Sequence, residues 1–257
     1  MDDADSNLSS SAPAAQKKPA FSPRQVLARH WRESVRYYGL PRYLLNLAGS
    51  AWLALLELLP QRRKARFGDL DYDWEHSVDT TRSNVGFGAQ LLAGLAGRPY
   101  FATEPWLFEQ IMQAIPVNLS SFTFIDLGSG KGRALLMASD YPFQRIVGVE
   151  FMPDLCRAAQ KNIAGYTSDR QRYRQIEIIC SDARDFQFPL EALVVYLFNP
   201  FSEPTFAAVL ENLRRSIKQS PRLVYIAYRF TEFEGLLAQA DWLEKVAGTE
   251  QWAVYRA

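Results

Sequence analysis

The stretch from Phe124 to Arg133, FIDLGSGKGR, holds residues whose types and spacing suit ligand binding. Gly128 and Gly130 allow a tight turn and the close approach of a ligand to bare backbone. The apolar residues before the turn predict a buried strand, and those after it predict a helix. A helix that begins at such a turn presents free N–H groups and the positive end of its dipole. The stretch therefore predicts a ligand-binding turn at the carboxyl end of a strand.

Two common nucleotide-binding patterns do not fit this turn. The dinucleotide fingerprint GxGxxG needs a third glycine where this sequence has Arg133. The phosphate loop GxxxxGK[ST] needs Ser or Thr at Gly132, and its first glycine would fall on Ile125. Asp126, just ahead of the turn, would repel a pyrophosphate, which argues against NAD. The pattern that remains is D-x-G-x-G-x-G.

Two acidic residues follow at the ends of the next two predicted strands. Glu150 ends the second strand, where a carboxylate can bind both hydroxyls of a ribose. Asp182 follows the third strand in the run Cys180-Ser181-Asp182-Ala183. Acidic residues often end strands as solvated charge. Their order on successive strands, after the glycine turn, favours a binding role instead.

The fourth predicted strand ends in Asn199-Pro200-Phe201. The Asn199 side-chain oxygen and a local backbone carbonyl can hold an N–H donor. Phe201 can lie against a planar base or a cationic centre. In the alternative interpretation, Asn199-Pro200 only ends the strand and Phe201 packs in the core, because turn residues of these types are common.

The series Asp126, Gly128, Gly130, Gly132 resembles the first motif of class I S-adenosylmethionine-dependent methyltransferases, and the resemblance covers about residues 100–257. It implies an α/β fold, a doubly wound, seven-stranded, Rossmann-like sheet. It also implies S-adenosylmethionine as the cofactor.

The resemblance implies roles for individual residues. The cofactor-binding set is Tyr100, Thr103, Asp126, Gly128, Ser129, Gly130, Gly132, Glu150, Asp182 and Ala183. Asp126 would face the methionine ammonium. Asp182 would accept a hydrogen bond from the adenine amine, and the backbone N–H of Ala183 would contact the ring. Tyr100 and Thr103 lie in a segment comparable to one that folds over the methionine end. The alternative for that segment is a loop with Thr103 near a helix cap.

The predicted catalytic residues are Asn199, Pro200 and Phe201. They resemble the Asn/Asp-Pro-Pro-aromatic motif of amino-group methyltransferases, with the second proline missing. They also resemble the Asn-x-Phe segment of the non-SET histone-lysine methyltransferases. Methyl transfer needs an aligned lone pair, so positioning does most of the work. The expected acceptor is a nitrogen of a protein lysine or a small amine. The alternatives are a nucleic-acid base methyltransferase and a non-catalytic scaffold that only binds the cofactor.

The run DWEHSVDT, from Asp73 to Thr80, precedes this region. Together with FIDLGSGKG and NPF it resembles a group of bacterial class I methyltransferases, and the resemblance carries no substrate with it. The neighbouring carboxylates are Asp69, Asp71, Asp73, Glu75 and Asp79. Their spacing lacks the glycine and closing glutamate of a calcium loop. Solvated loop charge is the favoured interpretation.

From Phe122 onward, β-forming apolar runs alternate with helical stretches, as in a parallel sheet with crossover helices. Strands are expected at 123–127, 146–150, 176–180, 193–198 and 223–228. Helices are expected at 105–115, 132–140, 153–164, 203–216 and 230–240. Segments 243–246 and 252–255 are spaced like a hairpin.

The chain divides into a disordered tail at 1–20, a helical cap and loop-rich extension at 21–99, and the cofactor-binding domain at 100–257. The tail has almost no large apolar residue to offset its ordering entropy. Two helices are expected in the cap, one from Ser22-Pro23 and one between Pro41 and Pro60. Residues 24–66 are strongly basic. The favoured interpretation is a cap with a solvated charged face. Peripheral membrane contact, or binding of nucleic acid or an acidic protein, is the alternative.

Composition excludes several classes of protein. A content of 48% apolar residues supports a sizeable core, and a net charge of +1 gives no overall attraction to nucleic acid or anionic membrane. Two Cys and two His form neither a disulfide framework nor a metal site by spacing. The N-terminus lacks the pattern of a signal peptide, and no apolar run is long enough to span a bilayer. A cytoplasmic enzyme without a metal is expected.

Overall fold

The computed structural model describes residues 22–56, 70–81, 102–173, 175–198 and 200–257. Seven strands form one sheet in the order β3-β2-β1-β4-β5-β7-β6. The strands are β1 (Phe122–Leu127), β2 (Arg145–Glu150), β3 (Ile176–Cys180), β4 (Ala192–Phe198), β5 (Val224–Arg229), β6 (Glu244–Gly248) and β7 (Trp252–Arg256). β1 to β5 pair in parallel, and β7 is antiparallel to both β5 and β6.

Two of the central strands, β1 and β5, are buried along their whole length. Every residue of β1 and β5 is buried, because helices cover both faces of the sheet. Strands of this kind have continuous runs of apolar β-formers, which is why their positions follow from the sequence. All five expected parallel strands are present, and the expected terminal pair forms the antiparallel hairpin of β6 and β7. The doubly wound fold is therefore confirmed.

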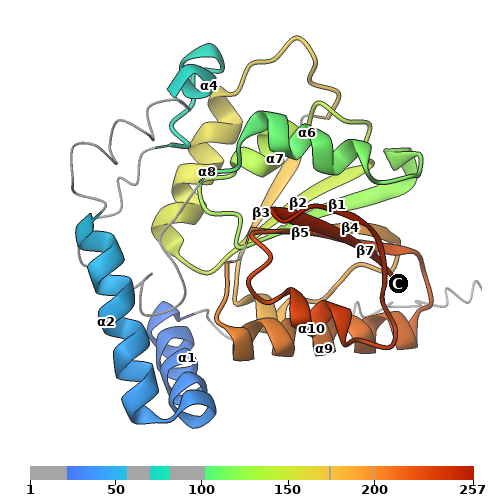
Figure 1. The fold of residues 1–257 in the computed structure, drawn as a ribbon. Helices are drawn as coiled ribbons and strands as arrows, with labels where there is room; N and C mark the ends of the chain where they lie inside the picture. The colour runs from blue at the N-terminus through green and yellow to red at the C-terminus, as the bar shows by residue number, and fades with distance from the viewer. Residues whose placement is uncertain (1–21, 57–69, 82–101, 174, 199) are drawn as a thin grey trace, which may run out of the picture.

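Helices cover the two faces of the sheet (Figure 1). One face carries α6 (Pro105–Gln113), α7 (Arg133–Ala138) and α8 (Pro153–Gly165), and the other carries α9 (Glu203–Gln219) and α10 (Glu234–Ala238). On the first face Phe108 and Tyr196 pack in one apolar cluster, and on the second Phe206 and Tyr228 pack in another. α10 begins four residues later than expected, because Phe230 has a φ of 71° and interrupts the helical backbone.

Two further helices precede the domain. α1 (Pro23–Tyr38) and α2 (Leu40–Leu56) form a helical hairpin at one end of the sheet, joined at Gly39, whose φ is 75° (Figure 1). Both helices were expected. A short helix, α4 (Leu70–Glu75), lies where loops were expected. The predicted tail at 1–20 lies outside the described residues, as does much of 21–99, so the proposed division into domains stays a prediction.

Candidate functional site

The glycine turn joins β1 to α7 at the carboxyl edge of the sheet. Gly128, Gly130 and Gly132 have φ values of 82°, 54° and 88°, in the left-handed region that favours glycine. Gly128 also faces Pro200, since a Cβ added at Gly128 would lie 2.3 Å from Pro200 Cβ. The turn after β1 and the segment after β4 are therefore in direct contact.

Glu150 connects the end of β2 to this turn. Its carboxylate accepts one hydrogen bond from the backbone N–H of Gly130, at 3.0 Å, and another from the backbone N–H of Met152, at 2.8 Å. Ser129, in the same turn, is buried. The glutamate predicted to bind a ribose thus also holds the glycine turn in place.

Asp126 and Glu150 are two buried carboxylates near one another. Burial, together with the negative charge of Glu150, raises the pKa of Asp126 to about 8. Burial also raises the pKa of Glu150, and the backbone hydrogen bonds it accepts oppose that rise. A cation beside Asp126 would offset this cost. The pair therefore fits a ligand that brings a positive group, such as the ammonium of S-adenosylmethionine.

Asp182, after β3, is already engaged by a neighbour. Its carboxylate accepts hydrogen bonds from the backbone N–H and the Nε of Arg184, both at 2.9 Å. Burial acts to raise the pKa of Asp182, but the hydrogen bonds and charge of Arg184 outweigh it, so the pKa lies below its ordinary value. An adenine amine at Asp182 would share the carboxylate with Arg184, a partner that the sequence did not predict.

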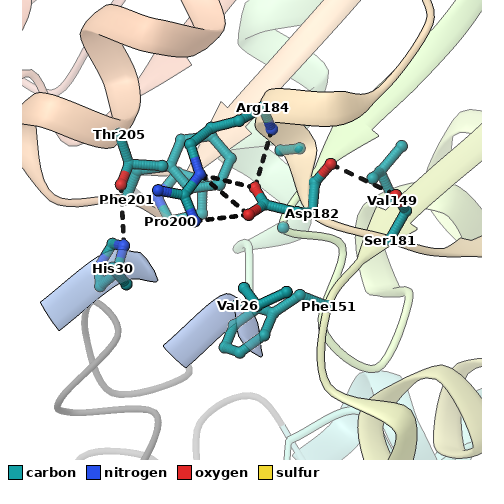
Figure 2. A pocket seen from close by; sticks show the side chains of 12 residues that line it. Val26, His30, Val149, Phe151, Ser181, Asp182, Arg184, Pro200, Phe201 and Thr205 are labelled. Carbon is teal, nitrogen blue, oxygen red and sulfur yellow. Dashed lines mark hydrogen bonds and ion pairs between the residues drawn. The ribbon is translucent and has the colours of Figure 1, made fainter. Parts of the chain in front are cut away.

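A small cavity brings several of the predicted residues together (Figure 2). It has a volume of about 30 Å³. Its lining includes Gly128, Asp182, Ala183, Pro200 and Phe201. Ligand sites enclose roughly 300–1,000 Å³, so this cavity is far smaller than a whole cofactor site.

Helix α1 forms one wall of this cavity, which the sequence did not predict. Val26 and His30 of α1 line it (Figure 2). The Nδ1 of His30 lies 2.9 Å from the Oγ1 of Thr205 at the start of α9. Helix α1 therefore contributes side chains to the cavity at the edge of the sheet.

Ion pairs attach α1 to the same edge. The guanidinium of Arg29 donates to Asp185 at 2.8 Å and 2.9 Å and lies 4.0 Å from Asp182. Glu33 pairs with both Arg29 and Arg184. These contacts link α1 to the carboxylate predicted to bind adenine.

Three further predicted residues lie elsewhere in the fold or outside the described residues. Thr103 is buried, and its hydroxyl forms a hydrogen bond of 2.9 Å with the hydroxyl of Tyr196 on β4. Tyr100 and Asn199 lie outside the described residues. Phe201 is half-buried and packs against the core below the sheet while it lines the cavity.

The expectation of solvated charge in the acidic segment before the domain was wrong for Asp73. Asp73 is buried and pairs with Arg133 of α7, with an Nη2–Oδ1 distance of 3.0 Å. It also accepts hydrogen bonds from the backbone N–H groups of Thr80 and Thr81, at 2.9 Å and 2.7 Å. Burial acts to raise the pKa of Asp73. The hydrogen bonds from Thr80 and Thr81 and the charge of Arg133 outweigh it, so the pKa lies below its ordinary value.

A second ion pair joins the same two segments. Lys131, in the glycine turn, donates to Asp79 at 3.1 Å. Asn162 of α8 donates to the backbone carbonyls of both Asp79 and Lys131, each at 3.0 Å. We call the contacts of residues 73–81 with Lys131 and Arg133 the turn latch. It holds the DWEHSVDT segment against the glycine turn.

Within the described residues, no group of three or more His, Cys, Asp or Glu side chains is arranged to hold a metal ion. Residues 124–220 match a family model described as a methyltransferase domain. No curated protein is significantly similar in sequence to this chain.

Three solved structures are similar over part of their length. A putative S-adenosyl-L-methionine-dependent methyltransferase from Methanococcus maripaludis is 19% identical, covering 59% of this chain and 83% of that one, with a TM-score of 0.44. An RNA methyltransferase from Salinibacter ruber, in complex with S-adenosyl-L-homocysteine, is 20% identical, covering 60% and 90%, with a TM-score of 0.37. A glycopeptide N-methyltransferase, complexed with S-adenosyl-L-methionine, is 15% identical, covering 62% and 67%, with a TM-score of 0.39.

The family match begins inside β1 and runs through the end of α9, so it contains the glycine turn, Glu150, Asp182 and the segment after β4. The strand order and the glycine turn described above agree with that match. Residues 124–220 therefore form a methyltransferase domain, of the class I, S-adenosylmethionine-dependent kind.

Proposed function

We propose that this domain transfers a methyl group from S-adenosylmethionine to a nitrogen, either of a protein lysine or of a small amine. The observation that carries the proposal is the contact of Pro200 with Gly128. It joins the Asn199-Pro200-Phe201 segment to the glycine turn on which the cofactor lies in this family. An acceptor held by that segment would be next to the transferable methyl.

Bound S-adenosylmethionine supplies an electrophilic methyl group on its sulfonium. Asp126 offers a buried carboxylate for the ammonium of the methionine part. Each oxygen of Glu150 accepts one backbone N–H and keeps a further lone pair, so the carboxylate can also accept both ribose hydroxyls. Asp182 and Ala183 line the small cavity beside which the adenine would lie.

The acceptor nitrogen needs a free lone pair directed at the methyl carbon. The Asn199 side-chain oxygen can accept a hydrogen bond from the acceptor N–H. Phe201, which lines the cavity, offers an aromatic ring for the acceptor to pack against. A lysine amine has a pKa of about 10.4 and must first lose a proton, which water can take. In this proposal the protein contributes mainly by positioning the acceptor.

The first test uses methyl-labelled S-adenosylmethionine in a cell extract that contains the purified protein. The extract is then separated into protein, nucleic-acid, lipid and small-molecule fractions. We expect label in protein lysine or in a small amine. Gly128→Val serves as the inactive control, because its side chain would collide with Pro200. Label in nucleic acid would show a base methyltransferase, and S-adenosylhomocysteine binding without any labelled product would show a scaffold.

The second test addresses the acceptor segment. Asn199→Ala should lower kcat at least about tenfold and leave S-adenosylhomocysteine affinity within a few fold, because a group that acts on the acceptor affects turnover more than cofactor binding. Steady-state kinetics and titration calorimetry measure the two effects. If cofactor binding collapses together with turnover, Asn199 has a structural role and our assignment fails.

A further inference from the structure

Helix α2 carries a continuous apolar face that the protein leaves exposed. Leu44, Leu45 and Trp52 are 52%, 72% and 62% exposed. Together with Pro41 and Ala48 they recur at the spacing of one helical face. Single exposed apolar side chains are ordinary on soluble proteins, but a contiguous strip of them marks an interaction surface.

The opposite side of α2 explains why this strip faces outward. Tyr43 is buried and Leu47 is half-buried on that side, where α2 packs against α1. The helix therefore already has its packing partner on one side. The exposed strip is a second apolar side of α2, which does not pack against α1.

The two helices carry mostly positive charge. Between residues 22 and 56 every charged side chain is an arginine except Glu33, and Glu33 is paired with Arg29 and Arg184. The exposed arginines of the two helices are Arg24, Arg32, Arg36 and Arg42. The sequence continues basic after α2, with Arg62, Arg63, Lys64 and Arg66. The whole chain has a net charge of only +1, so this basic character is local.

We propose that helices α1 and α2 form a surface that docks on an anionic lipid bilayer. Leucine and tryptophan side chains enter the boundary between headgroups and acyl chains, while arginines contact anionic headgroups. Among the described residues, no helix is long and apolar enough to cross a membrane. In this proposal α2 lies in the plane of the surface. This inference does not depend on the methyl acceptor.

Vesicle co-sedimentation of the full-length protein tests the proposal. We expect strong binding to vesicles of mixed phosphatidylcholine and phosphatidylglycerol, weak binding to pure phosphatidylcholine, and release by high salt. Leu45→Asp should weaken binding to the mixed vesicles at least about tenfold. Leu190→Asp is the matched control, because Leu190 is 67% exposed and lies just before β4, away from the hairpin.

A charge reversal tests the electrostatic part. Arg42→Glu should weaken binding several-fold, and Arg215→Glu, an exposed arginine on α9, should not. Circular dichroism and S-adenosylhomocysteine binding confirm that each variant is folded. Three results would overturn the proposal: no binding to either vesicle, equal losses for Leu45→Asp and Leu190→Asp, or a dimer that Leu45→Asp dissociates in the absence of vesicle binding.

Discussion

In our proposal, two buried carboxylates, Asp126 and Glu150, contact the cofactor. Both lie at the ends of central strands, and their pKa values are raised in the protein without ligand. Burying a charge is costly unless a partner compensates it. Ligand binding therefore changes the protonation of these groups as well as their contacts, and both effects are measurable.

Glu150→Ala should weaken S-adenosylhomocysteine binding by at least about tenfold. Charge-assisted hydrogen bonds are worth roughly 1.5–3 kcal/mol each, and ~1.4 kcal/mol corresponds to a factor of ten. Titration calorimetry measures the change, with Glu177→Ala as the control, an exposed glutamate on neighbouring β3. Glu150 also holds Gly130, so thermal unfolding of both variants is compared. Unchanged affinity in Glu150→Ala would contradict the ribose role.

Cofactor binding near pH 7 should release a proton from Asp126. With a pKa of about 8 the free protein holds this carboxyl mostly protonated at pH 7, and a bound ammonium favours the carboxylate and lowers the pKa. Affinity should therefore rise from pH 6 to pH 8 and level off above. Calorimetry in buffers of different ionisation enthalpy counts the released protons.

The control for this experiment is Asp126→Asn, which has no proton to release. We expect it to remove the pH dependence between pH 6 and 8 and to weaken binding at pH 8. Equal proton release by both proteins would show that another group titrates, and would remove the assignment of Asp126 to the ammonium.

At the scale of elements, α1 joins the helical hairpin to the carboxyl edge of the sheet, and the ion pairs of Arg29 and Glu33 are part of that attachment. Arg29→Ala should therefore speed amide hydrogen exchange in residues 23–38 several-fold, because the contacts of Arg29 with Asp185 and Glu33 are lost. Exchange in the central strands should not change. Arg32→Ala is the control. Arg32 also lies on α1, and its side chain donates to the backbone carbonyl of Ala28 in the same helix.

Ligand addition supplies the second half of that experiment. Val26 and His30 line the cavity with Asp182, so S-adenosylhomocysteine should slow exchange in α1 of the unaltered protein. If the ligand protects the glycine turn but leaves α1 unchanged, α1 is not part of the cofactor site.

The strands and the glycine turn could be predicted from the sequence because their signals are local. A buried parallel strand is a short apolar run, and a turn with positive φ needs glycine at particular positions. The late start of α10 was not predicted, because the φ of Phe230 depends on its surroundings and not on its residue type. Arg184 was missed for a different reason: arginine beside aspartate has no distinctive spacing.

At the scale of the whole molecule, the turn latch joins segments far apart in the chain. Asp73 and Arg133 are 60 positions apart, and no local pattern marks them as partners. Asp73 was therefore expected to be solvated, like its neighbour Asp71, which is indeed exposed. Long-range ion pairs of this kind follow from the packing of the folded chain.

Asp73→Ala should lower the free energy of unfolding by about 3–5 kcal/mol, since it removes the carboxylate that pairs with the buried guanidinium of Arg133. Asp71→Ala, two residues away and exposed, should change it by less than about 0.5 kcal/mol. Denaturant unfolding monitored by circular dichroism measures both. Because the pKa of Asp73 lies below its ordinary value, the stabilisation should be complete at neutral pH and lost as the pH falls through that lowered pKa. Equal stability of the two variants would show that the latch is not structural.

In the two proposals above, the two sides of helix α1 contact different ligands. Its inner side lines the cavity with Asp182, and its outer side carries Arg24, Arg32 and Arg36. If a bilayer shifts the position of α1, it changes the affinity for the cofactor, and reciprocity requires the cofactor to change the affinity for the bilayer by the same factor. A dissociation constant measured in buffer and one measured on vesicles would then differ, and their ratio would be the coupling between the two surfaces of a single helix.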